Sequence, residues 1–318
     1  MTDVHTALAA LTQLDGVTEA ADRAREASAA LRWHEGLRRR WREARAETAV
    51  RSAVADAALA GARVESGWLR AQVASGAART MHAASDRPAS STSDRSADDR
   101  PADGPPTGPG EALALAAWRG QAHVGELLGD LGGRGTAPAV PAAELLAGLH
   151  RDLTAHLALA GAVPDAAVGR PRSADQRPRE PGPDGIDGAP VGEELEVRLA
   201  ALRAVLEARD APALARVAVA HAEIVTLRPF LVGNGQLGRV VARLLAVRSG
   251  LEPTGVAVLD TYAAADPGRY RRALAGYASG TPAGVAAWLT FQADAVVAGC
   301  QAGAEVATAV LAGRVQPR

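Results

Sequence analysis

A glycine-rich turn, Gly233-Asn234-Gly235, is the stretch of this sequence whose residue types are best suited to chemistry. Glycine tolerates left-handed backbone, so successive N–H groups in such a turn can converge on an anion. The leucines and valines that follow, at positions 237, 240, 241, 244 and 245, have helical spacing. The turn is therefore predicted at a helix N-terminus, where unpaired N–H groups and the helix dipole favour phosphate. A loop that only leads into a core helix is the alternative interpretation.

The elements that position this turn are predicted to be helices. Strand signals are nearly absent, and long segments of Ala, Leu, Arg and Glu have a 3.6-residue period, which predicts an all-α fold. Residues 3–81 are expected to form two or three helices, in which Leu31, Trp33 and Leu37 make packing contacts within a charged helix at about 18–53. Further helices are predicted at about 110–130, 141–160, 192–209, 211–227, 236–249, 267–279 and 281–311, the last as a core or interface helix.

Two stretches interrupt the helical pattern. Residues 82–110 are rich in Ser, Asp, Pro and Gly and contain almost no large apolar residue, so they cannot bury enough surface to offset the entropy of ordering. They are predicted to be a disordered linker between an N-terminal helical region, 1–81, and a helical domain, 111–311. The second stretch, 169–190, contains five prolines and is predicted to be a flexible, exposed loop.

Composition argues against several classes of partner. The net charge of −1 gives no overall field toward nucleic acid or membrane, and neither partner is expected. All 35 basic residues are arginine, which with the abundant Ala and Gly indicates a GC-rich genome. The arginine cluster around Trp41 is interleaved with Glu35, Glu43 and Glu47, as in a solvated helix face. The single Cys300, the lack of a signal-peptide pattern and the lack of an apolar run of about 20 residues predict a cytoplasmic protein.

The string from Leu227 to Arg239, Leu-Arg-Pro-Phe-Leu-Val-Gly-Asn-Gly-Gln-Leu-Gly-Arg, resembles the signature of the Fic (Fido) family. That signature is His-Pro-Phe-x-Asp/Glu-Gly-Asn-Gly-Arg-x-x-Arg. Other segments between about 110 and 300 resemble family features in the family's order: Leu149 to Leu153, Gly169 to Arg172, Ala220 to Ala222, Leu259 to Tyr262, Tyr270 with Leu274, and Trp288. The resemblance implies a Fic-like helical domain. Most characterised members transfer AMP from ATP to a hydroxyl of a target protein.

The resemblance also assigns roles within the signature. Gly233, Asn234 and Gly235 stand at the family's phosphate cradle, and Phe230 at its buried anchor. Arg239 stands at the second motif arginine, which in the family contacts the terminal phosphates of ATP. A guanidinium suits that task because its charge is fixed and it binds phosphate oxygens in pairs. With Gln236, the three cradle residues and Arg239 form the predicted nucleotide or phosphate site.

Three reactive positions depart from the signature. Arg228 replaces the histidine that takes a proton from the attacking hydroxyl, and arginine does not deprotonate in proteins. Val232 replaces the carboxylate that holds Mg²⁺ and offers no ligand oxygen, so the motif is not expected to hold magnesium. Gln236 replaces the first motif arginine and brings no charge. Loss of a general base alone costs ~10²–10⁴-fold in rate, so no residue is predicted to be catalytic.

Two further features bear on activity. His150 and His221 are candidate substitute bases, although core or surface histidines on helices are the favoured interpretation.

Many Fic proteins carry an inhibitory helix, Ser/Thr-x-x-x-Glu-Gly/Asn, whose glutamate pairs with the second motif arginine. The segment Asp56 to Gly61, within a helix near 44–62, can be laid over it with Asp56 at the hydroxyl residue and Ala60 at the glutamate. That overlay implies that the inhibitory carboxylate is lost, and an ordinary Ala-rich helix is the alternative.

We therefore expect a Fic-like protein that is impaired in catalysis and acts by binding ATP, another nucleotide or phosphate, or through a protein target or regulatory partner. An active nucleotidyltransferase that modifies protein hydroxyls by altered chemistry is the alternative. A pure interaction scaffold is a third hypothesis.

Overall fold

The computed structural model describes residues 3–76, 108–131, 140–182 and 188–315. These residues form twelve α-helices and one short 3-10 helix, η1 (Asp165–Ala167), and they contain no strand beyond a single β-bridge between Pro171 and Phe230. The predicted all-α fold is thus confirmed. The linker predicted at 82–110 lies almost wholly outside the described residues.

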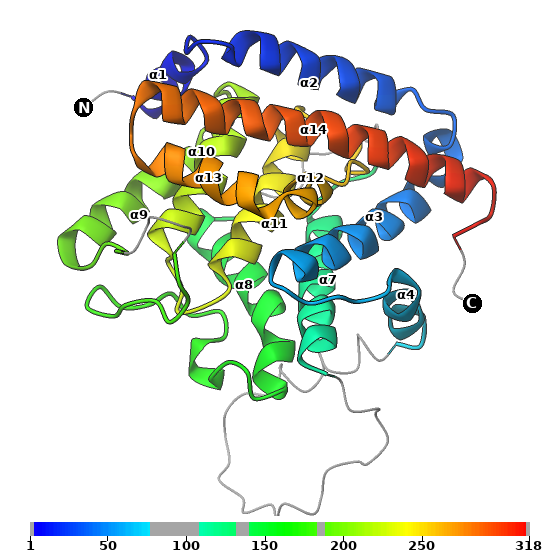
Figure 1. The fold of residues 1–318 in the computed structure, drawn as a ribbon, viewed down its shortest axis with the longest axis horizontal. Helices are drawn as coiled ribbons and strands as arrows, with labels where there is room; N and C mark the ends of the chain where they lie inside the picture. Colours follow the sequence, from blue (N-terminus) through cyan, green and yellow to red (C-terminus); the bar gives the residue numbers. More distant parts are fainter. Residues whose placement is uncertain (1–2, 77–107, 132–139, 183–187, 316–318) are drawn as a thin grey trace, which may run out of the picture.

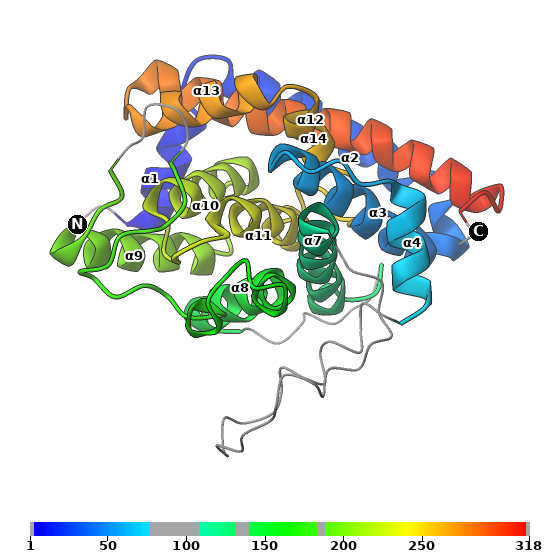
Figure 2. The ribbon, with the colours of Figure 1, turned by 60° about the horizontal axis from the view of Figure 1, so that its bottom comes forward.

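Two helices, α10 (Ala213–Leu227) and α11 (Asn234–Arg248), form the centre of the fold and lie side by side (Figures 1 and 2). Nearly all of α10 is buried, and so is most of α11. Their close approach needs a glycine at position 238, because a Cβ there would lie 2.8 Å from the Val225 side chain and 2.9 Å from the His221 ring. This tight pairing fixes both ends of the loop 228–233, which carries the signature.

Helices on several sides enclose this central pair. Helices α7 (Pro109–Leu127) and α8 (Ala142–Leu159) pack against α11, and α9 (Gly192–Glu207) packs against α10. Figure 2 shows α10 and α11 between α8 on one side and α13 (Pro267–Ala278) and α14 (Pro282–Leu311) on the other. All seven helices predicted after residue 110 are present within a few residues of their expected bounds. The short α12 (Asp260–Ala265), which makes less than two turns, was not predicted.

The N-terminal region contributes α1 (Val4–Leu11), α2 (Val17–Arg32), α3 (Leu37–Leu59) and α4 (Ser66–Ala74). Helix α2 lies along α14, as Figure 1 shows, and α3 packs against α7, α12 and α14. The expected helix at 18–53 is broken at residues 33–36. Leu31 and Leu37 are buried as predicted, but the prediction for Trp33 was wrong, because the break turns its side chain outward and leaves it 80 % exposed.

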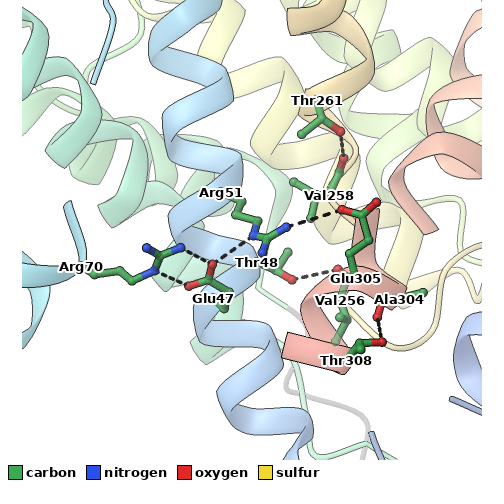
Figure 3. Close-up of polar contacts among 10 residues, drawn as sticks. All are labelled: Glu47, Thr48, Arg51, Arg70, Val256, Val258, Thr261, Ala304, Glu305 and Thr308. Carbon is green, nitrogen blue, oxygen red and sulfur yellow. Dashed lines mark hydrogen bonds and ion pairs between the residues drawn. The ribbon is translucent and has the colours of Figure 1, made fainter. Parts of the chain in front are cut away.

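Polar contacts fix α3 in its place (Figure 3). The buried Glu47 carboxylate accepts hydrogen bonds from Arg70 of α4, at 2.6 and 2.8 Å, and from Arg51, at 3.0 Å. Burial raises the pKa of Glu47, but these hydrogen bonds outweigh burial and the pKa is lowered overall. The Thr48 hydroxyl donates to the Val256 carbonyl at 2.8 Å. The helix face with Glu43 and Glu47 was expected to be solvated, but Glu47 is buried and bonded to α4. These contacts hold α3 in a position from which its later turns reach α11.

Among the described residues, α14 is the one helix whose length and apolar composition would allow it to cross a membrane. It packs against α2, α3, α10, α12 and α13, and its tryptophan, Trp288, is completely buried with its indole N–H donating to the Ala218 carbonyl at 2.8 Å. Helix α14 is therefore a core helix of this fold.

Candidate functional site

The signature loop leaves α10 through a left-handed residue. Arg228 has φ = 50°, and it is the one non-glycine residue in the left-handed region among those the structure describes. Its N–H donates to the Ile224 carbonyl at 3.0 Å, which closes the last turn of α10. Helices commonly end on a left-handed residue, but glycine is the usual choice because a Cβ is strained there. The loop thus stores backbone strain at the position of the motif base.

Asn234 closes the loop on itself. Its side-chain oxygen accepts from the Phe230 N–H at 2.9 Å, and its side-chain nitrogen donates to the Phe230 carbonyl at 2.9 Å. Asn234 is fully buried, and Phe230 is 1 % exposed, as expected for the anchor. Gly233 precedes α11 with φ = 78°, a conformation that glycine adopts without strain. The turn therefore has the geometry of an anion-binding helix N-terminus.

His150 of α8 supports the loop from beneath. Its Nδ1 accepts a hydrogen bond from the Gly169 N–H at 3.1 Å, so its Nε2 carries the proton and donates to the Val232 carbonyl at 2.8 Å. Its ring stacks on Phe230 at 3.9 Å between centroids. Burial lowers the pKa of His150 to about 4, which keeps the ring neutral. His150 positions the loop and has no free nitrogen with which to act as a base.

His221 of α10 is also a core residue. Its ring nitrogens contact the Tyr270 hydroxyl at 3.0 Å and the Gln292 amide at 3.2 Å, and its ring packs edge-on against Trp288. Burial, with the nearby charge of Arg239, lowers the pKa of His221 to about 3. Both histidines are therefore satisfied core residues, which was the favoured interpretation from the sequence.

The cradle at the N-terminus of α11 holds a carboxylate of the chain itself. Glu180 accepts hydrogen bonds from the Gly233 N–H at 2.6 Å, from the Asn234 N–H at 3.0 Å and from the Asn234 side-chain amide at 2.6 Å. Burial raises the pKa of the Glu180 carboxyl, and the hydrogen bonds from Asn234 and Gly233 offset only part of this rise. The predicted anion cradle thus has an internal anion, which the sequence did not reveal.

The segment that carries Glu180 is fastened to the signature loop. The Arg172 guanidinium, 4 % exposed, donates to the Arg228 carbonyl at 2.7 Å and to the Leu227 carbonyl at 3.1 Å. Arg179 donates its N–H to the Leu231 carbonyl at 2.7 Å. The prediction of an exposed loop at 169–190 was therefore wrong for Arg172, which is buried, and for Glu180, which is partly buried, although many residues between them are exposed. Residues 183–187 of that loop lie outside the described residues. Arg172 binds carbonyls that α10 leaves without partners at its C-terminal end.

Arg239 is bound by a second internal carboxylate. Its Nε and Nη2 donate to one oxygen of Asp56 on α3, and its guanidinium lies 5.9 Å from the centroid of the Tyr270 ring. The side chains of Arg239 and Asp56 are 7 % and 1 % exposed. The overlay of Asp56 to Gly61 on the inhibitory helix therefore did not predict that a carboxylate of this helix pairs with the second motif arginine. Helix α3 does lie against the second motif arginine, but its acid is Asp56, one turn before Ala60.

Further charges lie behind this ion pair. Asp260, which replaces the family serine, is buried and accepts from the Gln121 amide at 3.2 Å, and Gln121 accepts from Arg243 at 2.6 Å. Burial and the charge of Asp56 raise the pKa of Asp260 to about 6, against the opposing effect of Arg239 and Arg243. The cradle N–H groups and the Arg239 guanidinium are therefore each already bound to a carboxylate of the chain.

A cavity of about 370 Å³ adjoins the cradle, a size typical of small-molecule sites. It is lined by Glu180, Val232, Gly233, Gly235, Gln236, Arg239 and Tyr270, together with apolar residues that include Leu59 and Leu274. Gln236 is 6 % exposed, and its side-chain nitrogen has no hydrogen-bond partner in the protein. A buried amide donor without a partner is costly unless a ligand or water satisfies it. All five predicted binding residues thus line this cavity or the cradle beside it.

The residues of the loop do not fit a magnesium site. Val232 offers only its carbonyl, which already accepts from His150, and the nearest carboxylates are engaged with the cradle and with Arg239. The described residues contain no group of three or more His, Cys, Asp or Glu side chains that could hold a metal ion.

Two larger cavities, of about 600 and 640 Å³, lie away from the signature. Four arginines line the first, and three of them donate to carbonyls near the C-terminal ends of α7 and α9: Arg45 to Gly129, Arg216 to Val205, and Arg248 to Leu127. These arginines cap helix ends, which is an ordinary structural role. The signature residues line the smaller cavity and neither of these two.

No protein-family model matches this sequence, and no curated protein does. Solved structures do. Fic-1 from C. elegans has a TM-score of 0.58 at 17 % identity, covering 93 % of this chain and 74 % of its own. A Fic family protein from Desulfovibrio desulfuricans G20 has a TM-score of 0.54 at 17 % identity, covering 99 % and 76 %. A single-substitution variant of the C. elegans protein has a TM-score of 0.55 at 17 % identity, covering 93 % and 73 %. The resemblance read from the signature is thus confirmed at the level of the fold: this chain has the fold of Fic-family proteins.

Proposed function

We propose that this protein binds a phosphate-bearing ligand, of which a nucleotide is the leading candidate, in the cavity beside α11, and that it does not transfer a group from that ligand. The observation that carries the proposal is the contact between Glu180 and the cradle. Three donors from Gly233 and Asn234 converge on one carboxylate with distances of 2.6 to 3.0 Å. Donors arranged for one oxyanion can receive another of similar shape, and helix N-termini receive phosphate in this way.

Two further features of the cavity favour a bound ligand. The side-chain nitrogen of Gln236 is buried without a protein partner, so a phosphate oxygen would satisfy a donor that is otherwise left unpaired. Arg239 would add a guanidinium with fixed charge, provided that the ligand displaces Asp56 from it. At Arg239 the ligand would therefore replace one anion by another, whereas at Gln236 it would meet a donor that has no partner in the protein.

The absence of transfer follows from the side chains present. Arg228 cannot accept a proton, and the two nearby histidines are neutral and fully engaged in hydrogen bonds. Without a base or a metal ligand, the bound group has no activated nucleophile.

The alternative of an active nucleotidyltransferase makes a different prediction. Incubation of the protein with labelled ATP and a cell lysate would then label protein bands, and those bands would vanish in Arg239→Ala. We expect no labelled band above the background of a lysate without the protein. Labelled bands that depend on Arg239 would overturn the proposal that transfer is absent.

A pure interaction scaffold is the remaining hypothesis. It predicts no heat when ATP, ADP or pyrophosphate is titrated into the protein at millimolar concentration, and full function when Gly235 carries a bulky side chain. A Cβ at Gly235 would meet only the Arg239 side chain, at 3.6 Å, so a larger residue can be placed there without backbone strain. Gly235 lines the cavity, and a leucine at that position would take up part of it beside Arg239. The scaffold and binding hypotheses are therefore separable by one variant.

A further inference from the structure

We infer that Glu180 is a built-in ligand of the cradle, which keeps the cradle occupied until an external phosphate displaces it. The inference deepens the proposed function and rests on it only in naming phosphate as the competitor. Glu180 lies outside the signature, on the segment between α8 and α9, so it is an element of control that the signature itself does not contain.

The geometry makes the two occupants mutually exclusive. One oxygen of Glu180 accepts from the Gly233 N–H, and the other accepts from both the N–H and the side-chain amide of Asn234. These are the donors that define the cradle, and a backbone N–H donates along one direction. A phosphate oxygen can therefore reach them only after the carboxylate has left.

The backbone around Glu180 is already held against the loop. On one side, the Arg179 N–H donates to the Leu231 carbonyl at 2.7 Å. On the other, the Arg228 guanidinium donates to the carbonyl of Glu180 itself at 3.2 Å. A tethered group has a high effective concentration at its site, so a single carboxylate suffices to keep the cradle filled. This also gives Arg228 a role in place of the family's base, since it holds the segment that carries the internal ligand.

A ligand can compete with Glu180 only if its charge and its number of oxygens outweigh the advantage of the tether. An external monocarboxylate offers the same two oxygens without the tether and cannot compete. A diphosphate or triphosphate offers more negative charge and further oxygens for Gln236 and Arg239, so it can. If Glu180 fills the cradle for about nine-tenths of the time, the apparent affinity for such a ligand falls about tenfold, because only the open fraction binds.

The experiment compares the full chain with Glu180→Gln, Glu180→Ala and Asp175→Asn. Asp175 lies on the same segment, is exposed and makes no contact with the cradle, so its substitution removes the same charge without removing the contact. Pyrophosphate affinity is measured by calorimetric titration. The rate of hydrogen exchange at the Gly233 and Asn234 amides, measured without ligand, shows directly whether the Glu180 carboxylate is bound to them. Glu180→Gln keeps the shape of the side chain in case the alanine variant folds poorly.

We expect the two amides to be protected in the native chain and in Asp175→Asn, and to exchange at least tenfold faster in both Glu180 variants. We expect pyrophosphate to bind about tenfold more tightly to the Glu180 variants than to Asp175→Asn. Unchanged amide exchange with equal affinities would overturn the inference and leave the proposed function standing. Faster exchange without pyrophosphate binding by any variant would support Glu180 as the internal ligand and overturn the proposed function.

Discussion

The carboxylate of Asp56 on α3 and the guanidinium of Arg239 on α11 form an ion pair that is buried on both sides, with exposures of 1 % and 7 %. The two residues are 183 positions apart in the chain, so the pair ties the N-terminal helices to the signature. Burial lowers the pKa of Arg239, but the charge and hydrogen bonds of Asp56 outweigh burial and the pKa is raised overall. The pair thus connects α3 to α11 and also engages the motif arginine that lines the cavity.

The first prediction concerns the stability of this pair. Asp56→Ala leaves a buried guanidinium without its partner and should lower the free energy of unfolding by about 3 kcal/mol, and Arg239→Met should cost a similar amount. The double variant should cost much less than the sum, because it leaves no unpaired charge. Urea unfolding of the four proteins measures the coupling.

A matched control is the exposed pair of Arg42 and Asp130, whose side chains are 68 % and 64 % exposed. Asp130→Ala should change the free energy of unfolding by less than about 1 kcal/mol, because exposed ion pairs contribute little. If Asp56→Ala cost no more than Asp130→Ala, the buried pair would not anchor α3 to α11.

The second prediction concerns pH. Folded Asp260 has a pKa of about 6, whereas an unfolded aspartate titrates near pH 4. Between these values the folded state binds more protons, so this group makes the free energy of unfolding fall as pH rises. In Asp260→Asn that contribution is absent. The stability of the variant relative to the native chain should therefore rise by about 2 kcal/mol between pH 4 and pH 7.

The comparison with the native chain is needed because His150 and His221 act in the opposite sense. Their lowered pKa values mean that the unfolded state binds more protons up to about pH 6.5, so they make stability rise with pH. Their contribution is the same in both proteins and cancels in the difference. Denaturant unfolding of both proteins at several pH values measures the difference between their free energies of unfolding. A difference that stays constant with pH would contradict the raised pKa of Asp260.

The third prediction tests the left-handed backbone of Arg228, whose φ is 50°. Both Arg228→Gly and Arg228→Ala remove the guanidinium and its bond to the Glu180 carbonyl. Only the alanine variant keeps the Cβ that crowds the left-handed conformation, so the glycine variant should be the more stable by about 1 kcal/mol. Thermal or urea unfolding decides the order, and greater stability of the alanine variant would show that residue 228 is not left-handed in solution.

The fourth prediction is that restoring the motif histidine alone does not restore chemistry. In Arg228→His the loop would regain a base, but Val232 would still offer no ligand for magnesium and Gln236 would still bring no charge to the phosphates. Incorporation of label from ATP into lysate proteins should stay at background. A labelled band in the single variant would show that transfer needs neither the missing magnesium ligand nor the first motif arginine.

The sequence predicted more of the fold than of the site. The 3.6-residue period located the seven helices after residue 110, because each buries a periodic apolar face. It missed α12, whose six residues are too few to show a period, and the break before α3, which exposes Trp33. The cradle could be predicted because its residues are consecutive in the chain, and Arg239 because it matches a position of the signature. Asp56 and Glu180 could not, because a carboxylate 183 or 54 positions away from its partner leaves no periodic trace in the sequence.

The proposed function is the binding of a phosphate-bearing ligand in the cavity beside α11, without transfer of any part of that ligand. Calorimetric titration of ATP and ADP into the native chain, Glu180→Gln and Gly235→Leu tests it most directly, with the nucleotide recovered afterwards and checked for cleavage. We predict saturable binding at up to millimolar nucleotide for the first two proteins, tighter for Glu180→Gln, no binding to Gly235→Leu, and intact nucleotide throughout. Binding heat that is absent from both the native chain and Glu180→Gln, or that persists unchanged in Gly235→Leu, would contradict the account.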